Sequence, residues 1–370
     1  MNVSDFDYEL PPAQIAQRPL PERDASRLLL LRRATGVWTD RQFREFPDLL
    51  CGDELIVVNN TRVLPARLFG RRAGVNAQPV GEHNPARDEF LTGEIEVLLV
   101  RRLSADRWET LVRPGRKVPV GERIVFGQVA GQGKGDGELE AVIEERGEFG
   151  MRVARFRVAN GAGFAETIAR LGHIPLPPYI KRDDEPGDRE RYQTIFAREG
   201  SAVAAPTAGL HFTAAILERL RARGIEIAEI TLDVGLGTFE PLRTEQLEDH
   251  KIHAEAYEIP ESTAAAIERA RRDNRAILAV GTTVVRALED AAEKSAGRVA
   301  AGKAEAGIFL YPGKSFRVVN QMLTNFHLPQ SSLLALVAAF GGRERVLRAY
   351  RHAVEAGYRF YSYGDAMLIR

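Results

Sequence analysis

Residues 276–294 read AILAVGTTVVRALEDAAEK, a short apolar run that ends in glycine and passes directly into a helical pattern. The run AILAV has the length and composition of a buried strand, whereas VVRALEDAAEK has apolar residues at helical spacing. Between them, Thr282 or Thr283 is expected to cap the helix. A strand that leads into a helix in this way is the repeating unit of an α/β domain.

The same alternation extends over most of the second half of the chain. Thr213 is expected to cap the helix AAILERLRAR, which ends at Gly224, and IEIAEITLDV follows as a strand. Further elements complete the pattern: helices that begin at Ser262 or Thr263 and at Ser331 or Ser332, a helix over 343–355, and the strands DELIVVNN (53–60) and IFLYPG (308–313). Much of the sheet is therefore expected to be parallel.

A block of short strands interrupts this pattern between residues 94 and 158. Its segments are EIEVLLVRR, RWETLVR, RIVFG, ELEAVIEE and MRVARFRV. Regularly spaced short strands are typical of a small β-barrel or sandwich. We therefore predict an α/β domain formed by residues 1–61 and 161–370, which carries the ligand site, with residues 62–160 inserted as a small all-β, barrel-like domain.

Composition excludes several classes of protein. The 370 residues are enough for two or three domains. The 51 basic residues balance 51 acidic ones, which excludes histone-like binding to nucleic acid but leaves local basic patches open. Cys51 is the single cysteine, so neither an intramolecular disulfide nor a cysteine-based zinc site is expected.

No targeting or membrane segment is recognisable. The longest apolar run, 333–340, is much shorter than the roughly 20 residues of a membrane span. The first residues, MNVSDFDYEL, do not form the apolar core of a signal peptide. We expect a cytoplasmic protein without membrane contact.

Two loops after predicted strands carry glycines or hydroxyl groups. In GLGTF, Gly235 and Gly237 allow the backbone to approach an anion or a ribose, and Thr238 adds a hydroxyl. Thr282 and Thr283 lie at a comparable turn. Glycine turns at strand ends are mostly structural, so GLGTF alone is a weak signal, whereas a plain helix cap explains the two threonines as well as ligand binding does.

Two histidines lie at predicted helix entrances. His211 in APTAGLHFT is placed where the helix dipole disfavours an imidazolium, so a neutral base or hydrogen-bonding group and a packing histidine are equally supported. His327 lies in LTNFHLPQSS together with Asn325, in a loop of the kind that binds ligands in α/β proteins. His250 and His253 lack a third ligand, so a structural pair is favoured over zinc, and no metal is predicted.

Basic residues gather in two regions. One is around Arg62 and in VRPGRKVPVG, and the other surrounds YIKR at 179–182. Arginines near aromatic residues can bind phosphates and stack on unpaired bases. Ordinary surface charge explains the two basic regions as well.

Taken together, these stretches resemble the S-adenosylmethionine:tRNA ribosyltransferase-isomerase family of queuosine biosynthesis. The resemblance runs in order from Asp5 to Ile369 and rests on these segments: DFDYELPPAQIAQRPLPERDASRLL, LIVVNNTRVLPARLFG, WETLVRPGRKVPVG, GHIPLPPYIKR, RYQTIFA, VAAPTAGLHFT, VGLGTFEPLR, HKIHAEAYEIP, AVGTTVVRALE, LTNFHLPQSSLL and YRFYSYGDAMLI. One departure concerns chemistry: Asp233 stands where the family usually has histidine before its GxGTF motif. A second departure is in HKIHAEAYEIP, where the family more often has serine and an aromatic residue in place of Ala254 and Ala256.

The resemblance implies a specific reaction. The ribosyl part of S-adenosylmethionine is transferred and isomerised onto 7-aminomethyl-7-deazaguanine at the tRNA wobble position, and adenine and methionine leave as epoxyqueuosine forms. It also implies an α/β domain with an inserted β-barrel. Because S-adenosylmethionine is consumed as a co-substrate, no resident cofactor is expected.

Residue roles follow as hypotheses. His211 is the first choice for acid–base work and His327 the second, while Asp365 is expected to orient the ribose or a catalytic partner. Residues expected to bind the substrate are Asp233, Gly235, Gly237, Thr238, Thr282, Thr283 and Asn325. Residues expected to contact tRNA phosphates are Arg62, Arg113, Arg116, Lys117, Lys181 and Arg182. Two alternatives remain at this level, an S-adenosylmethionine-dependent RNA methyltransferase and a non-catalytic tRNA-binding protein. We expect a monomer.

Overall fold

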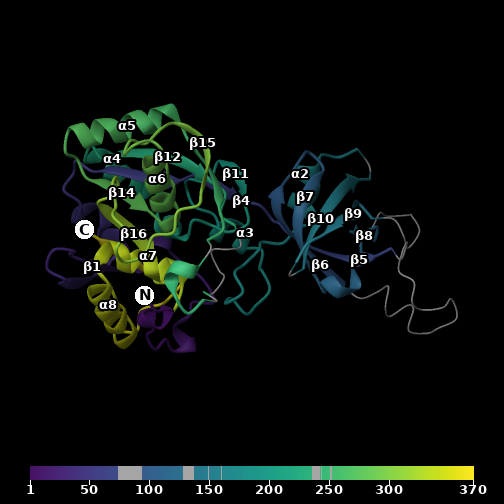
Figure 1. Ribbon diagram of the computed structural model, residues 1–370, viewed down its shortest axis with the longest axis horizontal. Coiled ribbons are helices and arrows are strands. Elements are labelled where there is room, and N and C mark those ends of the chain that lie inside the picture. Colours follow the sequence, from purple (N-terminus) through teal and green to yellow (C-terminus); the bar gives the residue numbers. More distant parts are fainter. Residues whose placement is uncertain are drawn as a thin grey trace. The chain divides into compact units, whose positions relative to one another are not determined.

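The computed structural model describes residues 1–73, 94–127, 137–148, 150–159, 161–235, 242, 244–250 and 252–370. The chain divides into two compact units (Figure 1). The first comprises Met1–Arg62, Pro177–Asp183 and Glu190–Arg370, and the second comprises Val63–Leu176 and Asp184–Arg189. Each unit has its own sheet.

The first unit is built on a mixed nine-stranded sheet. Its strands, in spatial order, are β15 (Gly302–Ala306), β13 (Glu255–Ile259), β12 (Glu226–Leu232), β3 (Leu55–Asn59), β14 (Ile277–Val280), β16 (Gln321–Asn325), β17 (Ala366–Ile369), β1 (Arg27–Leu31) and β2 (Trp38–Gln42). The central run from β12 to β16 is parallel, and β1 is parallel to β17. The remaining neighbours are antiparallel, including the edge strands β15 and β2.

Both faces of this sheet are covered. In β3, Leu55 and Val57 belong to one hydrophobic core, whereas the alternate residues Ile56 and Val58 belong to the other. Because successive side chains of a strand point to opposite faces, β3 is buried on both sides. The first core receives α5 (Glu261–Arg272), α6 (Thr282–Lys294), α7 (Ser332–Gly341) and α8 (Arg343–Glu355), and the second receives α4 (Ala214–Ala222).

Two of the three predicted helix caps are present. The hydroxyls of Thr213 and Ser331 accept hydrogen bonds from backbone N–H groups in the first turns of α4 and α7, which confirms both predicted caps. At α6, however, the cap is Gly281 with φ of 97°, so the prediction that Thr282 or Thr283 caps this helix is wrong. A positive φ is accessible to glycine at little cost, so Gly281 makes the tight turn from β14 into α6 possible.

The second unit is a closed antiparallel barrel. Its strands, in order around the barrel, are β10 (Met151–Val158), β7 (Arg107–Arg113), β6 (Glu94–Arg102), β5 (Arg67–Arg72), β8 (Arg123–Phe126) and β9 (Leu139–Arg146). Helix α2 (Phe164–Leu171) also belongs to this unit, because the Phe164 ring packs against Trp108 and Phe156. The second unit thus extends past residue 160, the boundary expected from the sequence.

The predicted fold class, an α/β domain with an inserted small β-barrel, is confirmed. One predicted strand is wrong: residues 308–313 form no strand, and the edge strand is β15, directly before them. Ile308 and Phe309 instead pack against the core as a loop. Among the helices of the described residues, none is both long and apolar enough to cross a membrane.

Candidate active site

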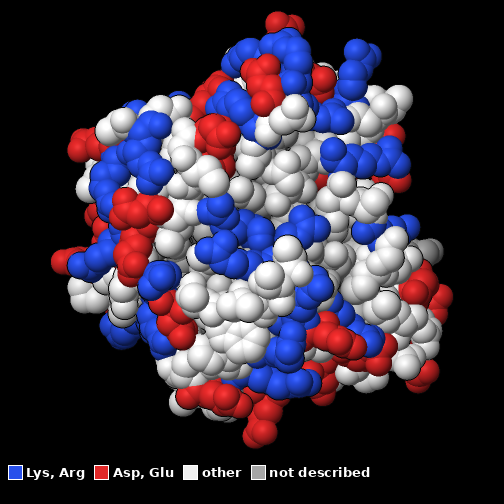
Figure 2. All heavy atoms as spheres, turned by 90° about the vertical axis from the view of Figure 1, so that its left-hand side faces the viewer, with Lys and Arg blue, Asp and Glu red and all other residues white. Residues whose placement is uncertain are grey.

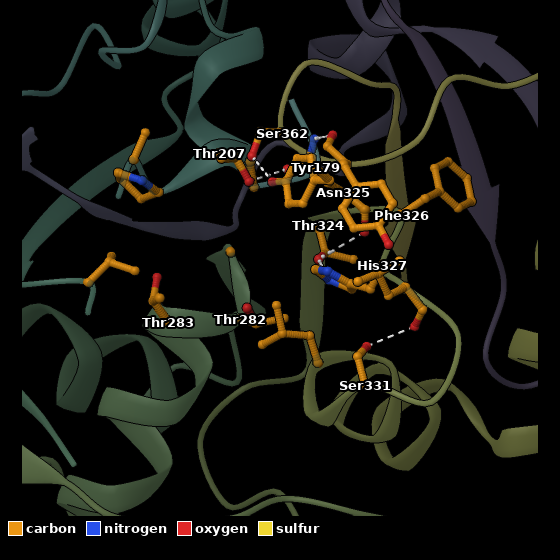
Figure 3. Close-up of a pocket in the computed structure, with 18 of the residues that line it drawn as sticks. Tyr179, Thr207, Thr282, Thr283, Thr324, Asn325, Phe326, His327, Ser331 and Ser362 are labelled. Atoms are coloured by element: carbon orange, nitrogen blue, oxygen red, sulfur yellow. Dashed lines mark hydrogen bonds between the residues drawn. The ribbon is translucent and has the colours of Figure 1, made fainter. Parts of the chain in front are cut away.

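A pocket opens in the first unit where β14 and β16 end (Figure 3). It contains about 800 Å³ of empty space, part of it open to solvent. Its wall is formed by Tyr179, Ala205, Pro206, Thr207, Ala208, Val234, Gly281, Thr282, Thr283, Thr324, Asn325, Phe326, His327, Leu328, Pro329, Ser331, Leu333, Tyr361 and Ser362. None of these described wall residues is Asp, Glu, Lys or Arg. The carboxyl ends of parallel strands are the usual ligand position in α/β sheets.

Asn325 connects the pocket wall to the residues behind it. Its Oδ1 accepts a hydrogen bond of 2.9 Å from the Thr207 hydroxyl. Its Nδ2 lies 3.1 Å from Nε2 of His211 and 3.2 Å from the carbonyl oxygen of Tyr361. The amide therefore joins the end of β16 to the short helical segment Thr207–His211 and to the segment that carries Tyr361.

His211 is buried behind Asn325. Its Nδ1 lies 2.7 Å from the hydroxyl of Ser26, and its ring stacks on Phe43 with 5.0 Å between centroids. Because the Asn325 amide donates to Nε2, the proton of the neutral ring is assigned to Nδ1, from which it is donated to Ser26. Burial lowers the pKa of His211 to about 3, with smaller contributions from Arg23 and Arg359. His211 also borders a second, smaller cavity on the side of Ser26.

His327 is part of the pocket wall itself. Its Nε2 lies 2.8 Å from the Thr324 hydroxyl, which also donates to the carbonyl oxygen of Asn325. Both contacts are satisfied when Nε2 carries the proton, which leaves Nδ1 as an acceptor. Burial lowers the pKa of His327 to about 3, so its ring is neutral at physiological pH.

Asp365 lies outside the pocket wall. Its two carboxylate oxygens accept hydrogen bonds of 2.8 Å from the backbone N–H groups of Arg27 and Arg359. Its backbone carbonyl lies 3.4 Å from Nδ2 of Asn325. Burial raises the pKa of Asp365 despite these hydrogen bonds. The Asp365 carboxylate therefore joins the start of β1 to the segment at Arg359.

The predicted substrate-binding residues fall into three groups. Thr282, Thr283 and Asn325 line the pocket. Asp233 accepts a hydrogen bond of 2.9 Å from the Thr61 hydroxyl, and the N–H of Gly235 donates to Glu255. Gly237 and Thr238 lie outside the described residues.

Tyr179 and Tyr361 form an aromatic part of the wall. Their ring centroids are 4.3 Å apart, and the Tyr179 hydroxyl lies 2.5 Å from that of Ser362. Tyr361 has φ of 73°, a left-handed conformation that costs energy in a residue with a side chain. Such strained residues cluster at functional sites.

The predicted tRNA-contacting cations occur in both units. Arg113, Arg116 and Lys117 are exposed at the end of β7 and in the turn after it, and Arg152 holds this turn through the carbonyls of Gly115 and Val118. In the first unit, Arg62 and Lys181 are exposed. Arg182 instead binds the backbone carbonyls of Gln17 and Asp183.

No described group of three or more His, Cys, Asp or Glu side chains is arranged to hold a metal ion. The ring of His250, one member of the pair considered from the sequence, packs edge-on against Phe309.

Sequence reasoning missed Ser26, Thr207 and Tyr361. Ser26 and Thr207 are ordinary polar residues in the sequence, and only the fold brings them to His211 and Asn325. Tyr361 lies in the segment YRFYSYGDAMLI, which carried part of the resemblance, but its strained backbone leaves no pattern in the sequence.

The protein thus consists of two units. One is an α/β unit with an uncharged small-molecule pocket at the ends of its strands, and the other is a closed barrel inserted into the chain of the first. The model of the family described as "Queuosine biosynthesis protein" matches residues 3–369. Over the full length of both chains, the protein is 54% identical to S-adenosylmethionine:tRNA ribosyltransferase-isomerase of Solibacter usitatus and 50% identical to that of Moorella thermoacetica. A crystal structure of S-adenosylmethionine tRNA ribosyltransferase from Thermotoga maritima matches with a TM-score of 0.52 and 36% identity, covering 99% of this chain and 100% of that one.

The chain belongs to the queuosine biosynthesis protein family, which confirms the resemblance noted from its sequence.

Proposed function

We propose that this chain is an enzyme that transfers and isomerises the ribosyl moiety of S-adenosylmethionine onto 7-aminomethyl-7-deazaguanine at the tRNA wobble position. The products are epoxyqueuosine-containing tRNA, adenine and methionine. The observation that carries this proposal is the full-length similarity to relatives named S-adenosylmethionine:tRNA ribosyltransferase-isomerase. S-adenosylmethionine is a consumed co-substrate, and the reaction takes place in the cytoplasm without a resident cofactor.

The chemistry of the pocket supports this substrate. Tyr179 and Tyr361 offer an aromatic surface on which a nucleobase can stack. Hydroxyl and amide groups from Thr207, Thr282 and Asn325 suit the polar edges of a nucleoside. The uncharged wall accommodates the cationic sulfonium without placing a second positive charge beside it.

Proton transfer is assigned to the two histidines. The sulfonium acidifies the C5′ protons of S-adenosylmethionine, so a side-chain base can begin the reaction, and the departing adenine takes up a proton. Burial keeps both imidazoles neutral and weakly basic, so either ring would need the charge of the bound substrate to raise its pKa before it serves as the base. His327 borders the pocket directly, whereas His211 reaches it through Asn325.

Asn325 and Asp365 act as supporting residues in this proposal. Asn325 positions His211, and Asp365 fixes the segment that carries Tyr361 and the carbonyl facing Asn325. Asp233 and Gly235 flank Val234 of the pocket wall and shape the neighbouring part of the nucleoside site.

The cations in both units serve tRNA binding. Arg113, Arg116 and Lys117 form an exposed basic turn in the barrel, and Arg62 and Lys181 are exposed in the first unit. Lys and Arg side chains bind phosphates without reading base sequence, which suits a substrate whose reactive base lies in an exposed loop.

The products released from S-adenosylmethionine test the reaction class. Incubation with S-adenosylmethionine and precursor-bearing tRNA is expected to release adenine and methionine in equal amounts, with or without a chelator. Release of S-adenosylhomocysteine without adenine would instead identify a methyltransferase. Binding of tRNA without consumption of S-adenosylmethionine would identify a non-catalytic binding protein.

A further inference from the structure

The first turn of α6 faces the pocket without a side-chain cap. Its N-cap is Gly281, which has no side chain, and its first turn contains no acidic residue. In contrast, α4 and α7 are capped by the hydroxyls of Thr213 and Ser331. The free N–H groups of a first turn carry partial positive charge, so the start of α6 attracts an anion.

A second, independent feature lies in the same turn. Thr283 is only 7% exposed, and its hydroxyl has no hydrogen-bond partner among the described residues. Figure 3 shows this hydroxyl directed from α6 towards the cavity, beside Thr282. A buried hydroxyl without a partner is costly, so a ligand group that accepts its hydrogen bond is expected to bind more tightly.

The pocket offers few other sites for an anion. Its described wall contains no Lys or Arg. Arg286, the buried cation on α6, is already bound to Glu255 and to the backbone carbonyls of His253 and Ala306. His327 does not supply a positive charge either, because burial keeps its ring neutral. Two helix starts, those of α6 and α7, border the described wall, and only that of α6 lacks a side-chain cap.

We propose that the first turn of α6 and the Thr283 hydroxyl form a carboxylate subsite, which binds the methionyl carboxylate of S-adenosylmethionine. One carboxylate oxygen accepts from backbone N–H groups of the turn, and the other accepts from Thr283. A tRNA phosphate shares this anionic chemistry, but the burial of Thr283 favours the small co-substrate. The inference rests on the proposed function and adds to it the orientation of the methionyl group.

The test compares two ligands on two variants by calorimetry. The ligands are S-adenosylmethionine and its decarboxylated form, which lacks only the carboxylate. Thr283→Val removes the hydroxyl and keeps the shape, whereas Thr283→Ser keeps the hydroxyl. Thr283→Val is expected to weaken S-adenosylmethionine binding about tenfold or more, the usual effect of losing a hydrogen bond to a charged group. Binding of the decarboxylated ligand should stay unchanged, and Thr283→Ser should bind like the wild type.

Several controls separate the outcomes. Thr39→Val, an exposed threonine on β2, should leave both affinities unchanged, and the melting temperatures show whether each variant is folded. Equal weakening of both ligands by Thr283→Val, or no weakening, would overturn the subsite while leaving the proposed function intact. Weaker tRNA binding with unchanged S-adenosylmethionine binding would assign the turn to a phosphate. Failure of the wild type to bind S-adenosylmethionine would refute the subsite and the proposed function together.

Discussion

The partners of His211 lie far from it in the sequence. Ser26 is 185 residues away and Asn325 is 114 residues away, yet both contact its imidazole nitrogens. The motif APTAGLHFT singled out the histidine as a candidate, but it contained no information on what would hold the ring. At the residue scale, candidate groups could therefore be predicted, whereas their protonation and orientation depend on the tertiary contacts.

Replacement of His211 tests its chemical role. His211→Ala is expected to lower turnover about 100-fold or more, the usual cost of losing a general acid or base. Tight tRNA binding should survive, because the predicted phosphate contacts are elsewhere. Single-turnover rates and tRNA affinity measure the two effects. Near-normal turnover would show that His211 only packs in the core, and His327 would then be the main candidate for the general acid or base.

Burial of His211 also predicts how stability depends on pH. The ordinary histidine pKa is 6.5, and it is lowered to about 3 in the fold. Between these values the unfolded chain binds a proton that the folded chain does not. The free energy of unfolding should therefore fall as the pH drops below 6.5, by up to about 1.4 kcal/mol per pH unit from this residue. Denaturant unfolding at pH 7.5 and pH 5 measures this effect. Between these pH values, His211→Gln should lose less free energy of unfolding than the wild type. Equal losses in both proteins would show that burial of His211 does not cause the pH dependence.

Asp233 provides a test of the departure from the family pattern. Its carboxylate accepts from the buried Thr61 hydroxyl, so an acceptor at this position satisfies a group that water does not reach. We expect Asp233→His to keep most of the activity with little change in the pH profile. Asp233→Ala should weaken substrate binding and lower the free energy of unfolding by about 1–3 kcal/mol, because Thr61 loses its partner. A large shift of the pH optimum in Asp233→His would make position 233 a proton carrier.

At the scale of elements, local chemistry predicted most helices but not all of their boundaries. Thr213 and Ser331 cap as expected, and α8 spans the predicted residues 343–355. Helix α5 begins earlier than expected, at Glu261, because the Thr263 hydroxyl bonds the carbonyl of Glu229 in β12 instead of capping the helix. The apolar run at 308–313 has the composition of a strand, but it covers the core as a loop. The start of α5 and the conformation of residues 308–313 therefore both depend on tertiary contacts.

The turn at Gly281 is the element whose geometry matters most for the pocket. Its φ of 97° is strained for any other residue, and an added Cβ would lie 3.6 Å from the Thr283 hydroxyl. Gly281→Ala is expected to lower the free energy of unfolding by about 1–3 kcal/mol and to weaken S-adenosylmethionine binding. Gly307→Ala is a matched control, because Gly307 has neither a positive φ nor an atom within 4 Å of the added Cβ. Equal effects of the two substitutions on stability would contradict this account.

At the scale of the whole molecule, the net charge is zero, but the charged side chains are unevenly distributed over the surface. Figure 2 shows basic and acidic side chains interleaved over one face, with basic groups gathered near its middle. With a net charge of zero, affinity for tRNA has to come from such local groups. The alternation of strands and helices predicted the α/β class and the inserted barrel. The antiparallel edge strands of the large sheet were not predictable, because pairing at an edge depends on where the chain returns.

Two exposed cations test the assignment of the tRNA contacts. Arg116→Ala in the barrel unit and Lys181→Ala in the first unit should each weaken tRNA binding. Each should also reduce the slope of log affinity against log salt by about one. Lys303→Ala, which removes an exposed cation from β15, serves as the control. Unchanged salt slopes in both variants would show that these residues do not face the tRNA.

In the proposed reaction, the ribosyl group of S-adenosylmethionine becomes part of the wobble nucleoside. Mass spectrometry of that nucleoside, after incubation of the purified protein with S-adenosylmethionine and precursor-bearing tRNA, measures this directly. We expect 7-aminomethyl-7-deazaguanosine to be converted to epoxyqueuosine in step with the release of adenine, and tRNA with an unmodified wobble guanosine to give no product. A nucleoside that gains only a methyl group, or stays unchanged while S-adenosylmethionine and tRNA are both bound, would contradict it.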